Sequence, residues 1–251
     1  MVEMNGEADR PERLLAGLGV ASRREVARWL AAGRLAVDER VLKGGERIRV
    51  SDRLTLDGRP LELPETQAQR RVIVYHKPVG EIVSRRDPEG RPTVFDALPE
   101  VAGGRWVAVG RLDVTTCGLL LFTSDGALAA RLMHPRHGLE RRYLVRVHGS
   151  LQPEVQRRLT QGVRLEDGVA RLTVCTPLAE STRSGSNRWY RVGLEEGRNR
   201  EVRRLFEAVG LEVSRLKRIG YGPVSLPREL RRGNWRELAA TEIAALDAAC
   251  R

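Results

Sequence analysis

The chain has 251 residues, of which 44 are Lys or Arg and 33 are Asp or Glu, so its formal net charge is +11. Hydrophobic residues make up 41%, which is enough for a packed core and excludes a wholly disordered chain. The sequence has no apolar run near the roughly 20 residues of a membrane span and no N-terminal signal core. Its cysteines, Cys117, Cys175 and Cys250, lie far apart, which excludes a disulfide framework and a CxxC metal site. We therefore expect a folded, basic, cytoplasmic protein that binds no membrane.

Residues 11–61 are expected to form a small separate module. An amphipathic helix is predicted over 12–18, and a second helix follows Ser22 as far as Ala32, because Ser22 and Glu25 fit a capping box. Val26, Trp29 and Leu30 would share its apolar face. Short alternating runs predict strands at 35–37, 48–50 and 54–56, and Asp57-Gly58 predicts a turn. Residues 62–70, rich in Pro, Glu, Thr and Gln, are expected to be a linker.

Residues 71–251 are expected to form a larger α+β domain. Strands are predicted at 72–75, 106–109, 119–123, 143–147, 170–174, 189–194 and 212–218. Helices are predicted at 127–133, 152–161, 199–209 and 241–249. This order lacks the regular alternation of a parallel-sheet enzyme, so it favours a largely antiparallel sheet.

The excess positive charge lies in two segments. Residues 11–61 carry a net charge of +4 and residues 198–236 carry +7, while the rest of the chain is neutral overall. The basic residues are 41 Arg and 3 Lys, a preference that suits phosphate contacts and base stacking. Codon bias in a GC-rich genome explains the Arg preference equally well. The positions of the charges therefore indicate two basic surfaces for an acidic partner.

The loop around Asp113 is the first candidate for chemistry. Asp113 lies close to Arg111 between two predicted strands, with Gly110 before it and Gly118 after it. A carboxylate there can act as a nucleophile or base, held ionised by a guanidinium. The alternative is a turn aspartate that accepts local backbone N–H groups. Asp125 is a competing carboxylate, but its position before a helix favours an N-cap.

The second candidate is the basic segment 196–206. Arg203 lies at the edge of the apolar stripe of a predicted helix, so it can point inward at a carboxylate while Arg200 and Arg204 bind phosphates. A solvated basic face is the alternative. Tyr143, at the start of a strand, can stack on an extruded base or pack in the core. The histidines are scattered and show no metal-ligand spacing.

Three motifs in order resemble the bacterial ribosomal pseudouridine synthases of the RsuA/RluB group. They are Gly110-Arg111-Leu112-Asp113 with Thr115 and Gly118–Leu121, Lys77-Pro78-x-Gly80, and Glu196–Arg204. The N-terminal module, with Ser22-Arg23-Arg24 and Gly33-Arg34, resembles the S4-like (alpha-L) RNA-binding domain of this group. Residues 87–96 and 187–190 are most similar to the RluB type, which acts on large-subunit ribosomal RNA. His76 stands where the group usually has Asn, and Arg141 where Lys is common.

The resemblance implies a pseudouridine synthase fold with a mainly antiparallel mixed sheet, which isomerises a uridine in 23S ribosomal RNA without a cofactor or metal. It implies catalytic roles for three residues: Asp113 as the essential carboxylate, Arg203 as its ion-pair partner and Tyr143 as the base-stacking ring. The implied substrate pocket contains Arg111, Leu112, Lys77, Val202 and Leu205. The implied RNA-binding residues are Arg13, Ser22, Arg23, Arg24, Arg34, Arg198, Arg200 and Arg204.

The implied partner is ribosomal RNA, free or within a large-subunit assembly intermediate, and the protein is expected to be a monomer. A small-subunit (16S) synthase of the same family is an alternative, as is a non-catalytic RNA-binding assembly factor. The survival of Asp113, Tyr143 and Arg203 favours the enzyme. A nuclease would need a carboxylate cluster for metal ions, and the sequence shows none.

Overall fold

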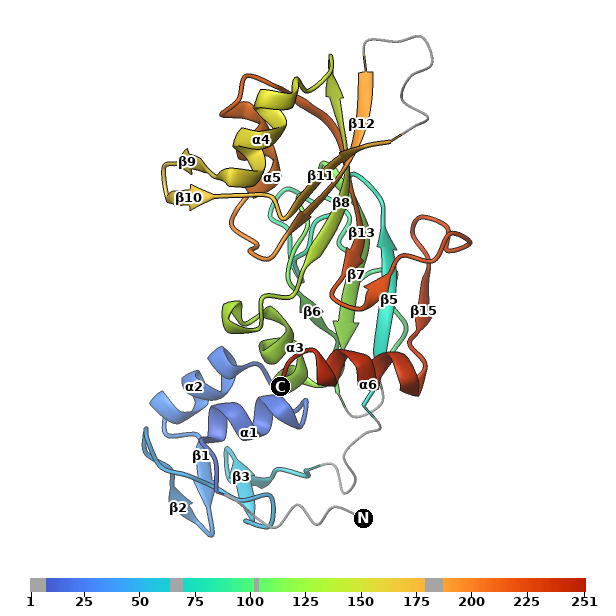
Figure 1. Cartoon of the computed structure of the whole chain (residues 1–251). Helices are drawn as coiled ribbons and strands as arrows, with labels where there is room; N and C mark the ends of the chain where they lie inside the picture. The colour runs from blue at the N-terminus through green and yellow to red at the C-terminus, as the bar shows by residue number, and fades with distance from the viewer. Residues whose placement is uncertain (1–7, 64–69, 102–103, 179–186) are drawn as a thin grey trace. The chain divides into compact units, whose positions relative to one another are not determined.

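The computed structural model describes residues 8–63, 70–101, 104–178 and 187–251 (Figure 1). These residues divide into two compact units. The first lies within 1–71 and also includes 100–107 and 124–127, and the second comprises 72–99, 108–123 and 128–251. Most of the expected linker, 62–70, lies outside the described residues. Within the described ranges, no helix has the length and apolar character needed to cross a membrane.

The first unit begins with two short helices, α1 (Pro11–Gly17) and α2 (Arg23–Ala31). The Ser22 hydroxyl accepts a hydrogen bond from the Glu25 main-chain N–H at 3.1 Å. This bond satisfies one free N–H of the first turn and confirms the predicted start of α2. Val26 and Leu30 of the predicted apolar face are buried, and Trp29 packs against the same core.

A small antiparallel sheet completes the first unit, in the order β2-β1-β3-β4. Its strands are β1 (Leu35–Val37), β2 (Arg40–Val41), β3 (Leu54–Leu56) and β4 (Arg59–Pro60). Asp57 and Gly58 have φ angles of 54° and 73°, so they form the predicted turn, with the conformation favoured in tight hairpins. The predicted strand at 48–50 is wrong: Ile48 is buried, but it makes only an isolated bridge to Asp9.

One long mixed sheet organises the second unit, in the order β11-β12-β8-β13-β7-β5-β15. Its strands are β5 (Val72–Lys77), β7 (Thr116–Thr123), β8 (Arg141–His148), β11 (Val174–Pro177), β12 (Asn187–Leu194), β13 (Val213–Tyr221) and β15 (Trp235–Glu237). Two short strands lie off this path: β6 (Val107–Val109) pairs with β7, and β14 (Val224–Ser225) pairs with β13. Along the path, only β13 and β7 pair in parallel, which confirms the expected, mainly antiparallel mixed sheet.

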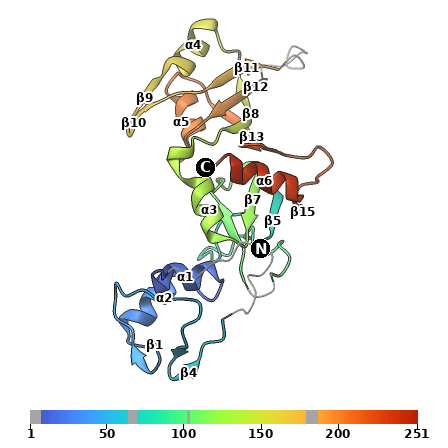
Figure 2. The same ribbon diagram turned by 60° about the horizontal axis from the view of Figure 1, so that its bottom comes forward.

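Helices cover this sheet at several places (Figures 1 and 2). They are α3 (Gly126–Met133), the short 3-10 helix η1 (Pro135–His137), α4 (Pro153–Gln161), α5 (Glu201–Glu207) and α6 (Ala240–Ala248). Leu159 of α4 and Phe206 of α5 are fully buried in one core with Val145 of β8 and Val192 of β12. This packing fixes the loop before α5 against the end of the sheet that carries the site described below.

Two predicted elements of this unit differ from the structure. Instead of a strand over 170–174, the chain forms a hairpin of β9 (Val163–Leu165) and β10 (Gly168–Ala170). The Leu172 N–H then donates to the Leu159 carbonyl at 2.8 Å, so the next strand, β11, begins only at Val174. Helix α5 begins at Glu201 rather than Asn199 because Arg200 has a left-handed φ of 47°.

Candidate active site

A pocket of about 610 Å³ lies entirely within the second unit. Its walls come from residues 83–85, the loop 110–113, the segment 194–202, and strands β8 and β13. Seven of the predicted site residues line it together: Asp113, Tyr143, Arg111, Leu112, Val202, Arg198 and Arg200. Residues that are far apart in the sequence therefore meet at one cavity, whose size suits a nucleotide.

The loop that carries Asp113 is held in place by hydrogen bonds from the Lys77-Pro78-x-Gly80 motif. The Lys77 ammonium donates to the main-chain carbonyls of Asp113 at 3.2 Å and Thr116 at 3.0 Å, and to that of Pro78 at 2.9 Å. The Gly80 N–H donates to the Val114 carbonyl at 2.9 Å. Lys77 is 0% exposed and does not line the pocket, which corrects its prediction as a substrate-pocket residue. Its bonds instead shape the loop that presents Asp113.

Tyr143 reaches the pocket from β8, where it is partly buried. It pairs with Arg218 of β13, and Arg218 in turn pairs with Gly118 of β7. Directly opposed residues project from the same face of a sheet, so Tyr143 and Arg218 are neighbours on one face. The tyrosine ring also packs against the adjoining core. Tyr143 thus packs against the core and also lines the pocket, and its role as a base-stacking ring stays a prediction.

Arg203 lies in α5 and is 9% exposed. Its guanidinium donates to the main-chain carbonyls of Val213 at 2.7 Å and Thr115 at 3.3 Å. Among the described residues, no ion pair joins it directly to Asp113. Burial lowers the pKa of Arg203, and the negative charge of Asp113 opposes this shift, so the two side chains interact through space. Arg203 therefore supplies positive charge near Asp113 and also binds the loop at Thr115.

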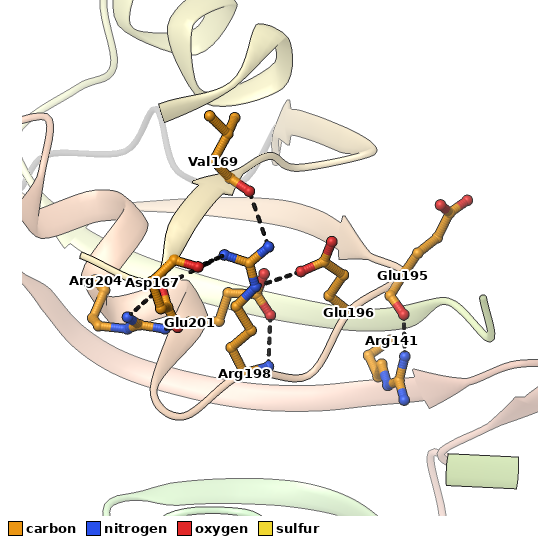
Figure 3. Close-up of polar contacts among 8 residues, drawn as sticks. All are labelled: Arg141, Asp167, Val169, Glu195, Glu196, Arg198, Glu201 and Arg204. Carbon is orange, nitrogen blue, oxygen red and sulfur yellow. Dashed lines mark hydrogen bonds and ion pairs between the residues drawn. The ribbon is translucent and has the colours of Figure 1, made fainter. Parts of the chain in front are cut away.

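Arg198 and Arg204 are engaged by acidic and carbonyl groups (Figure 3). Arg198 donates to Glu196 at 2.6 Å and to the Val169 carbonyl at 3.0 Å. Arg204 makes a bidentate pair with Asp167, with both bonds at 2.9 Å. These contacts tie the β9–β10 hairpin to the segment before and within α5. The two guanidiniums thus have structural partners, which corrects the expectation that both are open to phosphate.

Arg200 and Arg111 remain exposed at the pocket. The buried Glu201 carboxylate accepts the Arg198 main-chain N–H at 2.9 Å, which fixes the turn that holds Arg200 outward. Exposed guanidiniums at the rim of a pocket are suited to phosphate binding. Arg111 and Arg200 are therefore exposed cations at the pocket, and their role in phosphate binding stays a prediction.

The apolar wall of the pocket includes Leu112 and Val202, as predicted, but not Leu205. Leu205 is fully buried in the core with Phe206 and Leu216. The prediction of Leu205 as a pocket residue is wrong because α5 turns this side chain towards the sheet. Val202, one helical turn earlier, is the residue that reaches the cavity.

In the first unit, the expected RNA-binding arginines differ in their surroundings. Arg23 and Arg24 are exposed in the first turn of α2. Arg34 makes a bidentate pair with Asp57, with the Nε bond at 2.7 Å, and Arg13 pairs with Asp9 at 3.2 Å. The Ser22 hydroxyl is used in the helix cap. Among the described residues, no ion pair involves Arg23 or Arg24, whereas Arg13 and Arg34 each have an acidic partner.

Sequence reasoning missed several pocket residues, among them Thr116, Arg218 and Tyr221. Tyr221 donates to the Leu132 carbonyl at 2.9 Å, and the guanidiniums of Arg141 and Arg218 lie 5.1 and 5.4 Å from its ring centre. An arginine and a tyrosine near the end of an apolar strand give only a weak sequence signal. Their importance becomes visible only when β13 is placed between β7 and β8.

The fold and the pocket together define the class of protein. A family model described as RNA pseudouridylate synthase matches residues 71–208, a range that includes the Asp113 loop, Tyr143 and Arg203. The chain belongs to this family. A crystal structure of a pseudouridylate synthase superposes with a TM-score of 0.65 at 25% identity, covering 94% of this chain and 99% of that one.

Curated relatives have a more specific name. The ribosomal large subunit pseudouridine synthase B of Escherichia coli (strain K12) is 51% identical over 92% of this chain and 79% of its own length. The enzyme of the same name from Shigella flexneri is also 51% identical, over 92% of this chain and 80% of its own length. The Pseudomonas aeruginosa enzyme is 49% identical over 94% of this chain. The family predicted from the three motifs is therefore confirmed.

Proposed function

We propose that this protein converts a uridine of 23S ribosomal RNA, in the large ribosomal subunit, to pseudouridine. About half of its residues are identical to those of enzymes named for the large subunit, over nine-tenths of the chain. The observation that carries the proposal is that one pocket brings together Asp113, Tyr143 and exposed arginines. A carboxylate, a ring for stacking and cations for phosphate are what an enzyme needs to bind and react with an extruded base.

The reaction is an isomerisation and needs no added atoms. The bond from the ribose C1′ to N1 of uracil breaks, the base turns, and a bond from C1′ to C5 forms while C5 loses its proton and N1 gains one. Asp113 would be the carboxylate that starts this sequence, by attack on the sugar or base or by removal of the 2′ proton. Tyr143 would stack on the flipped uracil, and Leu112 and Val202 would exclude water from the pocket.

The remaining residues position Asp113 and the RNA. Lys77 and Arg203 hold the loop through its main-chain carbonyls, and Arg203 also places a positive charge near Asp113. Arg111 and Arg200 would bind phosphates at the rim. The first unit would act as an S4-like RNA-binding domain through Arg23 and Arg24. We place the enzyme in the cytoplasm, with its ribosomal substrate, and propose that it acts as a monomer.

The decisive variant is Asp113→Asn, with Asp125→Asn as its matched control. The Asp125 carboxylate accepts the Ala127 N–H at 2.8 Å before α3, so its loss affects a helix start and not the pocket. With RNA tritiated at uracil C5, Asp113→Asn should release no tritium and bind RNA within a few fold of wild type. Asp125→Asn should keep its turnover. Turnover by Asp113→Asn would refute the proposed role.

The target is tested by mapping pseudouridine in ribosomal RNA from cells with and without the gene. One site in 23S RNA should disappear and return when the gene is restored. Loss of a site in 16S RNA instead would assign the enzyme to the small subunit. If every site persisted, the proposed function would be wrong.

A further inference from the structure

Two buried polar atoms in the pocket have no partner within the described residues. The Arg218 side chain is 2% exposed, and its Nε donates to the Leu119 carbonyl at 2.6 Å, but its second terminal nitrogen, Nη2, is unpaired. Thr116 is 1% exposed, and its hydroxyl is also unpaired. Both residues line the pocket with Asp113. Burying an unpaired polar group is costly, so two of them in one cavity point to a ligand.

Both groups project from paired strands of the central sheet. In the parallel pairing of β7 and β13, Thr116 is opposite Leu216 and Gly118 is opposite Arg218. Residues 216 and 218 face the same side of their strand, so the Thr116 and Arg218 side chains share one face of the sheet. The Arg218 guanidinium also lies against the Tyr221 ring. A ligand in the pocket can supply the hydrogen-bond partners that these two groups lack.

We infer that Arg218 and Thr116 bind the polar edge of the flipped uracil and select uracil against cytosine. The inference rests on the proposed function. Tyr143 pairs with Arg218 across β8 and β13, so a base stacked on this ring lies beside the guanidinium. The exposed arginines at the rim are placed to bind phosphates. The buried groups are placed to bind the base, because the base enters the pocket furthest.

The chemistry of the two groups fits the uracil edge. This edge presents a carbonyl oxygen, an N–H and a second carbonyl oxygen, whereas cytosine has an amine in place of the O4 carbonyl. Arg218 Nη2 can only donate, so it suits a carbonyl oxygen and meets the cytosine amine donor to donor. The Thr116 hydroxyl can accept from the neighbouring N–H or donate to a carbonyl. A site that leaves a buried donor unpaired rejects the wrong base strongly.

The first test removes the threonine hydroxyl at two sites. Thr116→Val should lower kcat/KM for tritium release by about tenfold, which is the loss expected for one hydrogen bond, without lowering the melting temperature. Thr116→Ser should restore the rate. Thr93 is the matched control, because it is 9% exposed with an unpaired hydroxyl but does not line the pocket, so Thr93→Val should keep wild-type activity.

The second test changes the RNA and leaves the wild-type protein intact. Target RNAs carrying 2-thiouridine or 4-thiouridine replace one carbonyl oxygen with a weak acceptor. If Arg218 binds one of the two carbonyl oxygens, the RNA with sulfur at that position should react with a kcat/KM about tenfold lower, or lower still, than the normal RNA. The thiouridine that shows this loss identifies the oxygen that faces Arg218. In Arg218→Met, that RNA and the normal RNA should react at the same rate.

The outcomes separate this inference from the proposed function. Wild-type activity in Thr116→Val, together with equal wild-type rates on all three RNAs, would overturn the inference and leave the proposed function standing. Absence of pseudouridine formation by the wild-type protein on ribosomal RNA would overturn the proposed function itself. If Arg218→Met does not fold, the inference is still tested by the activities of Thr116→Val and Thr116→Ser and by the wild-type rates on the thiouridine RNAs.

Discussion

The Lys77 ammonium donates a hydrogen bond to the main-chain carbonyl of Asp113 at 3.2 Å. Two further carbonyls, of Thr116 and Pro78, accept its remaining N–H groups at 3.0 and 2.9 Å. A protonated lysine has three N–H donors, and here the protein backbone uses all of them. The conformation of the loop that carries the candidate carboxylate thus depends on the charge of a side chain that never contacts solvent.

Activity should fall as the pH rises through about 8. Burial lowers the pKa of Lys77 to about 8, and the neutral amine has two N–H groups for three carbonyl oxygens. The measurement is kcat for tritium release across this range. Lys77→Met should have a reduced kcat, RNA affinity within a few fold of wild type, and no fall centred near pH 8. A wild-type rate that stays level above pH 8 would contradict this role.

The same shift has the opposite effect on stability. Lys77 has a pKa of about 8 when folded and about 10.5 when unfolded, so between these values the unfolded chain binds more protons. The contribution of Lys77 to the free energy of unfolding should therefore become more favourable as the pH rises from about 8 to about 10.5. Denaturant unfolding of wild type and Lys77→Met at several pH values checks this. Their difference should change in that window and stay constant below it.

Gly118→Ala should destabilise the protein far more than Gly110→Ala. A Cβ at Gly118 would lie 2.1 Å from the Arg218 carbonyl oxygen, and φ there is 114°. The opposing backbone of β13 cannot move without breaking the sheet, so we expect a loss of about 4 kcal/mol or more. Gly110 has a positive φ of 75° but open space around it, so its cost should be about 1 to 2 kcal/mol. Denaturant unfolding compares the two, and equal losses would exclude the close contact.

Arg200→Gln should weaken RNA binding more than Arg204→Gln. Arg200 is exposed at the pocket, whereas Arg204 is held by Asp167 in bonds of 2.9 Å. Loss of one phosphate contact should lower the slope of log affinity against log salt by about one. Binding titrations at several salt concentrations measure this slope. A larger effect for Arg204→Gln would show that RNA displaces Asp167 from its partner.

Ser22→Ala should destabilise α2 by about 1 kcal/mol, because it removes the acceptor of the Glu25 N–H. Ser22→Asp supplies another acceptor and should keep the helix stable. Hydrogen exchange of the α2 amides measures the local effect. Faster exchange in both variants would show that the side-chain acceptor is not what holds the start of α2.

Local sequence signals were sufficient for much of the fold. Ser22 at a helix start, Asp57-Gly58 at a turn and the continuous apolar run 119–122 each act over a few residues, and all three appear as predicted. The predictions failed where contacts or backbone conformations that the local sequence pattern does not reveal determine the structure. Leu172 bonds to α4 instead of a strand, and the left-handed Arg200 delays the start of α5.

The candidate site was predicted unevenly for a related reason. Motif resemblance identified Asp113, Tyr143 and Val202, which do line one pocket. The same resemblance could not tell which cations are available to bind RNA. Lys77 donates its hydrogen bonds to main-chain carbonyls, and Arg204 is paired with Asp167. Hydrogen-bond partners of a charged side chain depend on the tertiary structure, so they cannot be read from spacing alone.

The position of β13 in the sheet affects how the enzyme is made. This strand is synthesised after both of its neighbours, yet it lies between β8 and β7 in the sheet. Its contact from Arg218 to Leu119 joins residues 99 positions apart. A growing chain that has emerged from the ribosome only as far as β12 thus has a gap where β13 belongs. Incomplete chains lack Leu216, Arg218 and Tyr221, so they cannot form the part of the pocket wall that β13 supplies.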